Sequence, residues 1–173
     1  CQYVNMTHHP LFLKPRNTTF STPPNGSDPP KRTNLCLKNK LIVTMPAAFS
    51  PGCTSAHLPS LLQHEADLLK IVSNVYVLTS DSVFALDAWR RQAFEKHQAT
   101  DSRLEFISDP NCEFGREMGI VKQTDLIGTV FMRGALYFNE KEELQWVVTD
   151  ALKMDKTSGR ELLQKLKMQR SNL

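Results

Sequence analysis

A loop between an apolar strand and an apolar helix constrains this chain more than any other feature. The residues PAAFSPGCTSAHLP (46–59) follow directly after the run LIVTM (41–45). A short β-branched apolar run predicts a buried strand. After the loop, leucines recur at helical spacing and predict a helix over about 52–70, kinked at Pro59. The sequence therefore places Cys53 where a helix begins after a buried strand.

The alternation of strand and helix continues along the chain. Buried strands are predicted at 75–79 and 104–107, and Ser80 and Asp81 are N-cap candidates for a helix between them. Further predicted elements are a short helix near 112–118, strands at 130–131, 135–138 and 144–148, and a last helix whose capping box is Ser158–Glu161. This order, β-α-β-α-β and then β-β-α, predicts an α/β domain.

The first part of the chain differs in composition from the rest. Residues 8–32 contain six of the ten prolines and lack the apolar periodicity that repays ordering. We therefore expect residues 1–38 to form a Pro-rich arm or loop, with room for one short first strand, and residues 39–173 to form the domain. Residues 1–40 hold six Lys/Arg against one Asp, and the remainder is nearly neutral. Nucleic acid is therefore not an expected partner.

Cysteine usage and hydropathy indicate the cellular setting. No apolar run approaches the roughly 20 residues that span a bilayer, so no membrane association is expected. The four cysteines, Cys1, Cys36, Cys53 and Cys112, form no C-x-x-C pair and no metal-ligand spacing. We therefore expect no metal site. An organic cofactor is not expected either.

The compartment is predicted from the same features. So few cysteines favour a reducing compartment, and we expect a cytoplasmic protein, with the peroxisome or the mitochondrion as alternatives. The final Ser-Asn-Leu loosely resembles a peroxisomal address. Glycosylation triplets at Asn5, Asn17 and Asn25 would fit secretion instead, although a segment rich in Asn, Ser and Thr also produces them by chance.

The position of Cys53 indicates nucleophilic chemistry. Only a thiolate attacks, and the first turn of a helix stabilises it with partial positive charge and unpaired N–H groups. Gly52 permits a close backbone approach, Pro46 and Pro51 stiffen the loop, and Ser50 offers a hydroxyl to a small polar ligand. A peroxide suits such a site, because attack on one oxygen leaves negative charge on the other. The product would be a sulfenic acid on Cys53.

The same residues resemble the peroxiredoxin signature Pro-x-x-x-Thr/Ser-x-x-Cys, with Pro46, Ser50 and Cys53 in register. The whole loop is similar to the peroxiredoxin-5 type, in particular its fungal alkyl hydroperoxide reductase branch. Two further segments are similar to the same branch, VYVLTSDSVFALDAW (75–89) and FISDPNCEFGREMGI (106–120). The resemblance covers about residues 39–148 and implies a thioredoxin-like fold, with a central mixed β-sheet flanked by helices. It also implies a thiol peroxidase that reduces hydrogen peroxide and alkyl hydroperoxides.

The resemblance further implies roles for particular residues. An arginine from a later strand lies beside the thiolate in this family, and MRGALYF (132–138) offers Arg133. The implied catalytic residues are Cys53, Arg133, Ser50 and Pro46, and Gly52, Ser50 and Arg133 would contact the peroxide. The family also implies recycling by thioredoxin or by glutaredoxin and glutathione, and a homodimer formed through the face around the active-site loop.

The resolving thiol remains open. Residues 150–173 lack the C-terminal cysteine of one branch of the family. Cys36 is the nearest counterpart of the N-terminal cysteine that fungal relatives use across a dimer, and Cys112 matches another fungal cysteine. If neither acts, an external thiol attacks Cys53 in a one-Cys cycle. A redox relay that passes oxidation from Cys53 to a partner protein is the alternative function, and an inactive relative that keeps the fold is a third. We expect His57 to be a packing or interface residue rather than a base.

Overall fold

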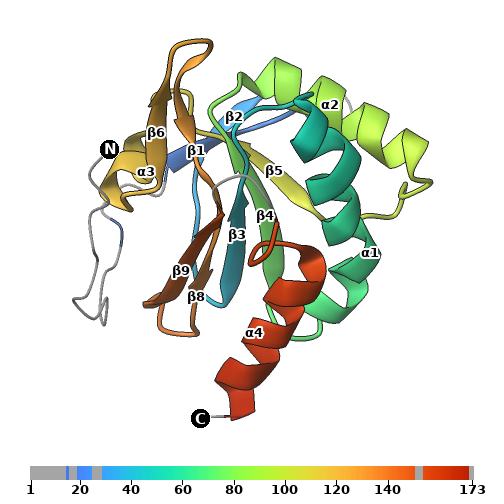
Figure 1. Cartoon of the computed structure of the whole chain (residues 1–173), viewed down its shortest axis with the longest axis vertical. Coiled ribbons are helices and arrows are strands. Elements are labelled where there is room, and N and C mark those ends of the chain that lie inside the picture. The colour runs from blue at the N-terminus through green and yellow to red at the C-terminus, as the bar shows by residue number, and fades with distance from the viewer. Residues whose placement is uncertain (1–14, 16–18, 25–28, 151–153, 172–173) are drawn as a thin grey trace.

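A computed structural model describes residues 15, 19–24, 29–150 and 154–171. The described chain forms a seven-stranded sheet in the order β2-β1-β5-β4-β3-β8-β9, and a separate two-stranded hairpin, β6-β7 (Figure 1). Cys1 lies outside this description. Each of the three glycosylation triplets, which begin at Asn5, Asn17 and Asn25, also includes residues outside it. Among the described residues, no helix has the length and apolar character needed to cross a bilayer.

The centre of the sheet is mixed, as expected. β3 (Lys40–Thr44), β4 (Asn74–Thr79) and β5 (Glu105–Ser108) pair in parallel. β8 (Arg133–Phe138) runs antiparallel to β3, and β9 (Leu144–Asp150) runs antiparallel to β8. β3 and β4 are buried on both faces, which explains why they read as continuous apolar runs. The carboxyl end of β3 and the amino end of β8 therefore meet at one edge of the sheet.

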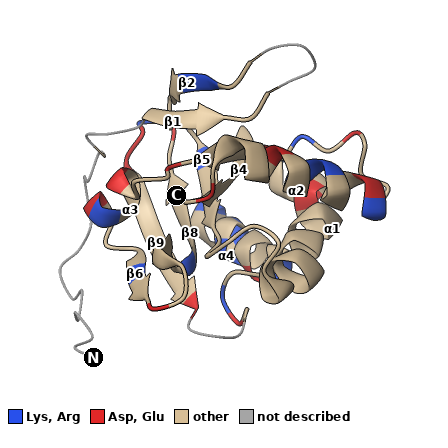
Figure 2. Ribbon diagram, turned by 90° about the horizontal axis from the view of Figure 1, so that it is seen from above, with Lys and Arg blue, Asp and Glu red and all other residues tan. Residues whose placement is uncertain are grey.

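Within the described part of the chain, three longer helices cover one face of this sheet (Figure 1). They are α1 (Leu58–Leu68), α2 (Val83–Lys96) and α4 (Gly159–Ser171). Their apolar sides form one core cluster with the inward residues of the strands. On α2 the acidic and basic positions lie next to one another, and Asp87 pairs with both Arg90 and Arg91 (Figure 2).

A second core cluster fills the opposite face. α3 (Glu113–Glu117), β6 (Val121–Thr124) and β7 (Gly128–Phe131) lie on this side. Phe131 and Phe114 are almost fully buried there. The sheet thus separates two cores, and a residue of one core is screened from the other by the strands.

Two strands extend the sheet within the predicted arm. β1 (Thr19–Thr22) and β2 (Lys31–Asn34) pair with each other, and β1 meets β5 through Ser21 and Ser108. The described residues of the predicted arm therefore include two paired strands, where the sequence left room for one short strand. The reason is Phe20, which is 1% exposed and packs edge-on against Phe114 at a centroid distance of 5.2 Å. A domain boundary at residue 38 stays a prediction.

The predicted caps are confirmed at one helix and corrected at another. Ser158 Oγ accepts a hydrogen bond from the Glu161 N–H at 3.3 Å, as the capping box requires. At α2 the cap is Ser82, whose Oγ accepts from the Ala85 N–H at 3.3 Å, rather than Ser80 or Asp81. Asp81 has a different role, described below.

Candidate active site

The helix that carries Cys53 begins with a wide turn. Helical backbone starts at Pro51, and Cys53–His57 form a π-helical segment that continues into α1. The Leu58 N–H donates to the Cys53 carbonyl, five residues back. Pro59 has no N–H for the regular α-helical bond to the Ser55 carbonyl, which accounts for the wider turn. The kink predicted at Pro59 is thus a π-helical turn just before it.

The structure brings Arg133 to Cys53. Cys53 is fully buried, and Arg133 Nη2 lies 3.8 Å from its Sγ. Arg133 is the first residue of β8 and reaches the cysteine because β8 pairs with β3, the strand that leads into the loop. Its other terminal nitrogen, Nη1, is buried and has no hydrogen-bond partner among the described residues. The guanidinium can therefore contact the sulfur while keeping one donor for a further group.

Gly52 favours this approach. A Cβ added at Gly52 would lie 3.0 Å from Arg133 Nη2, which is tighter than normal side-chain contacts. The absence of a side chain leaves room for the guanidinium beside the first helical turn.

The loop before Cys53 is anchored by its own polar groups and by a neighbouring loop. Ser50 Oγ donates to the Ala47 carbonyl at 3.0 Å, and the Ser50 carbonyl accepts from the Thr54 N–H at 2.9 Å. The Ala48 N–H donates to Asp81 Oδ2 at 2.7 Å, so Asp81 ties the loop after β4 to the loop after β3. Asp81 is therefore a loop anchor and not the helix cap that its place before α2 predicts. Pro46 is half-buried at the start of the same loop.

Trp89 also contacts the first turn of the helix. Its Nε1–H donates to Thr54 Oγ1 at 3.0 Å, directly after Cys53 in sequence. Trp89 is fully buried and packs edge-on against Phe106. It is a packing residue, and it also holds the residue next to the cysteine.

His57 is buried at the end of the π-helical segment. Its Nε2 lies 2.8 Å from the Thr157 carbonyl, so Nε2 carries the proton, and Nδ1 has no partner among the described residues. Burial, together with the nearby Arg133 charge, lowers the pKa of His57 from 6.5 to about 4, against the opposing effects of the Thr157 bond and Asp150. The side chain is therefore neutral at physiological pH, which fits the packing role predicted from the sequence.

The other described cysteines lie away from Cys53. Cys53 belongs to the core on the helix face, and Cys112 belongs to the core on the opposite face of the sheet. Cys112 is 1% exposed, and burial raises the pKa of its thiol. Cys36 is exposed in the segment between β2 and β3. The three thiols are free, and no bond joins Cys53 to either of the other two.

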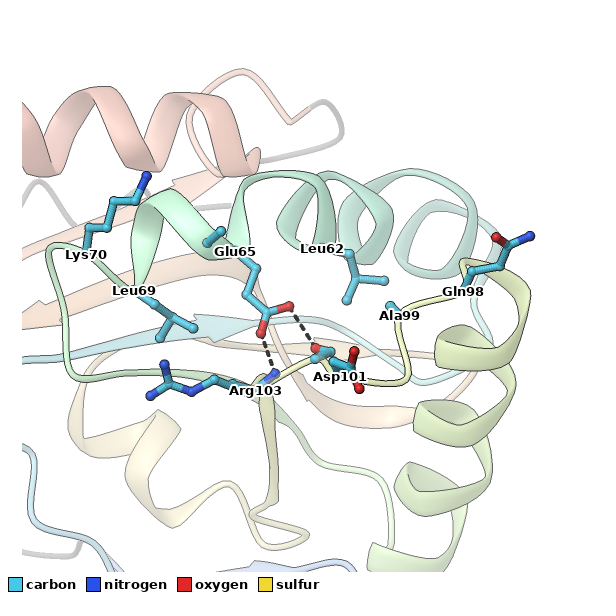
Figure 3. Close-up of a pocket in the computed structure, with 10 residues that line it drawn as sticks. Leu62, Glu65, Leu69, Lys70, Gln98, Ala99, Asp101 and Arg103 are labelled. Atoms are coloured by element: carbon cyan, nitrogen blue, oxygen red, sulfur yellow. Dashed lines mark hydrogen bonds between the residues drawn. The ribbon is translucent and has the colours of Figure 1, made fainter.

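A pocket elsewhere on the molecule does not contain these residues. It lies between α1 and the segment that joins α2 to β5 (Figure 3). Within it the buried Glu65 accepts hydrogen bonds from Ser102 Oγ, at 2.8 Å, and from the Arg103 N–H. This carboxylate therefore holds the turn before β5, and the pocket is separate from the cysteine site.

Fold and site together define a class of protein. A buried cysteine at the start of a helix behind the central strand, with an arginine against its sulfur, defines a thiol-dependent redox protein of thioredoxin-like fold. The Redoxin family matches residues 28–158, which is well over half of the chain. The chain belongs to this family as a peroxiredoxin and is a thiol peroxidase.

Individual relatives agree with this assignment. Peroxiredoxin-A of Candida boidinii is 31% identical over 121 residues, which cover 68% of this chain and 71% of the relative. The peroxiredoxin Pen c 3 of Penicillium citrinum is 26% identical over 118 residues, covering 61% and 68% of the two chains. The predicted resemblance to fungal peroxiredoxins is confirmed.

Solved structures confirm the thioredoxin-like fold. Reduced Prx3 of Vibrio vulnificus, crystallised with hydrogen peroxide, matches with a TM-score of 0.78 at 17% identity, over 92% of this chain and 97% of the other. Peroxiredoxin 5 of Alvinella pompejana gives a TM-score of 0.72 at 15% identity, over 91% and 97%.

Proposed function

We propose that Cys53 is the peroxidatic cysteine of this thiol peroxidase and that Arg133 assists its reaction. The carrying observation is the 3.8 Å contact between Arg133 Nη2 and Cys53 Sγ at the start of a helix. The guanidinium and the helix N-terminus both favour the charged sulfur. The buried Nη1 is free to donate to a peroxide oxygen as negative charge develops on it.

The loop residues would shape this site. Ser50 positions the peroxide through its hydroxyl, Gly52 leaves room for Arg133, and Pro46 shields the sulfur from solvent. The supporting contacts are the Ser50–Ala47 hydrogen bond and the close approach of Arg133 to Gly52. The substrates would be hydrogen peroxide and alkyl hydroperoxides.

The reductant would be an external thiol, supplied by thioredoxin or by glutaredoxin and glutathione. Cys112 is a poor resolving residue, because it is buried in the core on the other side of the sheet from Cys53. Cys36 is exposed and could act only from a partner subunit, or after a large rearrangement. An external thiol could attack the Cys53 sulfenic acid without a partner subunit and without a large rearrangement.

A homodimer would form through the face around the active-site loop. Phe49 lies in this loop and is 49% exposed, and Phe84 on the first turn of α2 is 68% exposed. The Ala48–Asp81 hydrogen bond holds their two segments together, so both rings belong to one neighbourhood. Large exposed aromatic side chains beside a functional site favour a protein interface.

The compartment is proposed to be cytoplasmic, with the peroxisome or mitochondrion as alternatives. A relative from Lipomyces kononenkoae, 32% identical over 84 residues, carries a name that describes it as a peroxisomal peroxiredoxin. Imaging of the tagged chain, with the tag at either end, would distinguish these compartments.

Intact mass spectrometry tests the proposed chemistry. The wild type, Cys53→Ser, Cys36→Ser and Cys112→Ser are treated with peroxide, and we expect the oxidised product to be lost only in Cys53→Ser. A disulfide-linked dimer lost in Cys36→Ser would identify that residue as the resolving thiol. Peroxide consumption with thioredoxin and its reductase separates a scavenger, which turns over, from a relay, which is oxidised once. Continued turnover by Cys53→Ser would show that the assignment is wrong.

A further inference from the structure

Two side-chain bonds fasten the end of the π-helical segment to the start of α4. His57 Nε2–H donates to the Thr157 carbonyl at 2.8 Å, and the Gly159 N–H donates to Ser60 Oγ at 3.2 Å. Ser60 Oγ in turn donates to the His57 carbonyl at 2.8 Å. We call these bonds the His57 clamp. The packing is tight, because a Cβ at Gly159 would lie 2.2 Å from the Ser60 carbonyl oxygen.

The His57 clamp is held from the sheet as well. Thr157 Oγ1 donates to Asp150 Oδ2 at 2.6 Å, and the same carboxylate accepts from the Lys156 N–H. Asp150 is buried at the end of β9, directly opposite Arg133 in the β8–β9 ladder. The clamp therefore links the helix that carries Cys53 to the strand beside Arg133.

The opposite end of the same segment is more exposed to solvent. Pro51 and Gly52 are exposed, and the first turn is fastened by the Thr54–Ser50 backbone bond, the Ser55–Pro51 bond and the Trp89–Thr54 bond. His57, in contrast, is fully buried. Unwinding from the N-terminal end would therefore free Cys53 and stop at His57.

We propose that His57 is a positioning residue that sets how often Cys53 leaves Arg133. This inference rests on the proposed peroxidatic role of Cys53. While the clamp holds, unwinding stops at His57, and the short opened segment returns the sulfur to the pocket, where it meets peroxide. When the clamp is weakened, unwinding extends beyond residue 57 and the sulfur is exposed to other thiols more often.

The chemistry offers a direct measure of this balance. The Cys53 thiolate attacks a peroxide, so an S–O bond forms, the O–O bond breaks, and the leaving oxygen takes a proton as water or alcohol. The sulfenic acid then follows one of two routes. A second thiol attacks it, forming a disulfide and releasing water, or the sulfenate attacks a second peroxide, forming sulfinic acid and releasing water or alcohol. The first route needs the exposed sulfur and the second needs the sulfur in its pocket.

The experiment compares matched variants of the full chain in one mixture of hydrogen peroxide and glutathione. His57→Leu removes the bond to Thr157, whereas His57→Gln keeps a donor at the same reach. His97→Leu makes the same change at an exposed histidine. Peptide mass mapping gives the ratio of mixed disulfide to sulfinic acid on Cys53, because the mass of the intact chain would not separate Cys53 from the exposed Cys36. We expect this ratio to rise about fivefold in His57→Leu, the effect on an equilibrium of losing one net hydrogen bond, and to stay within about twofold in the other two variants.

Each outcome has a distinct meaning. The positioning role would be overturned if His57→Leu had the same ratio of mixed disulfide to sulfinic acid as the wild type. It would also be overturned if the ratio rose in His57→Gln as much as in His57→Leu. If His57→Leu does not fold, Thr157→Val removes the bond to Asp150, and we expect the same rise in the ratio, with faster amide exchange over residues 51–58. An unchanged ratio and unchanged exchange there would contradict the proposal. A wild type with no oxidised Cys53 would instead refute the proposed function.

Discussion

The burial of a neutral histidine makes the stability of this protein depend on pH. His57 has a pKa of about 4 in the folded chain against 6.5 for a free imidazole. Between these values the unfolded chain binds one more proton than the folded chain, so the free energy of unfolding falls as pH falls. From the two pKa values, we expect a loss of about 2 kcal/mol between pH 7 and pH 5, and about 3 kcal/mol by pH 4. Domains of this kind are stable by only about 5–15 kcal/mol, so the loss is measurable.

Urea unfolding at several pH values between 4 and 7 measures this loss. In His57→Gln the side chain keeps a donor for Thr157 but does not titrate, and we expect its stability curve to lack this part of the acid dependence. Other groups whose pKa is shifted by folding, such as Asp109, titrate alike in both chains and cancel in the difference. His97→Gln, at an exposed position, should follow the wild type. Parallel curves for the wild type and His57→Gln would show that His57 is not a buried neutral residue.

Three further predictions concern the active site and its surroundings. Arg133→Met should slow the loss of the Cys53 thiol to peroxide by about 100-fold in quenched-flow mass spectrometry, because a donor to the developing charge is lost, whereas Arg91→Met should react normally. Gly52→Ala should slow the same step by about tenfold, because its Cβ would crowd Arg133 Nη2, and an unchanged rate would argue against the observed approach. Phe84→Glu should shift the chain from dimer to monomer in sedimentation velocity, because the new carboxylate would be buried in the proposed interface. The control is Leu126→Glu, at a position on the hairpin that is 90% exposed, and it should leave the dimer intact.

Local patterns in the sequence were sufficient for the central fold. The strands at 41–45 and 75–79 are apolar throughout because both of their faces are covered, and the structure places β3 and β4 there. The cysteine loop was readable because its prolines, glycine and cysteine each have a local conformational or chemical effect. Arg133, in contrast, was found through the family resemblance, since nothing in its own neighbourhood distinguishes it from other arginines.

The contacts that sequence reasoning missed join distant segments. Phe20 stands alone among threonines and serine, so no periodicity marks its strand, yet its ring is buried against Phe114. Asp81 followed a strand and preceded a helix, which made a cap the simplest prediction, although its carboxylate binds the Ala48 N–H. His57 and Thr157 lie 100 residues apart, and a local pattern contains no information on such a bond.

The indole beside the cysteine has a practical consequence. Trp89 donates its ring N–H to Thr54, so its emission should respond when that first turn opens. The chain has one other tryptophan, Trp146, and replacing it with Phe would leave a single tryptophan, which is hydrogen-bonded to the residue after Cys53. Opening and closing of the site could then be followed optically, in real time and without an attached dye.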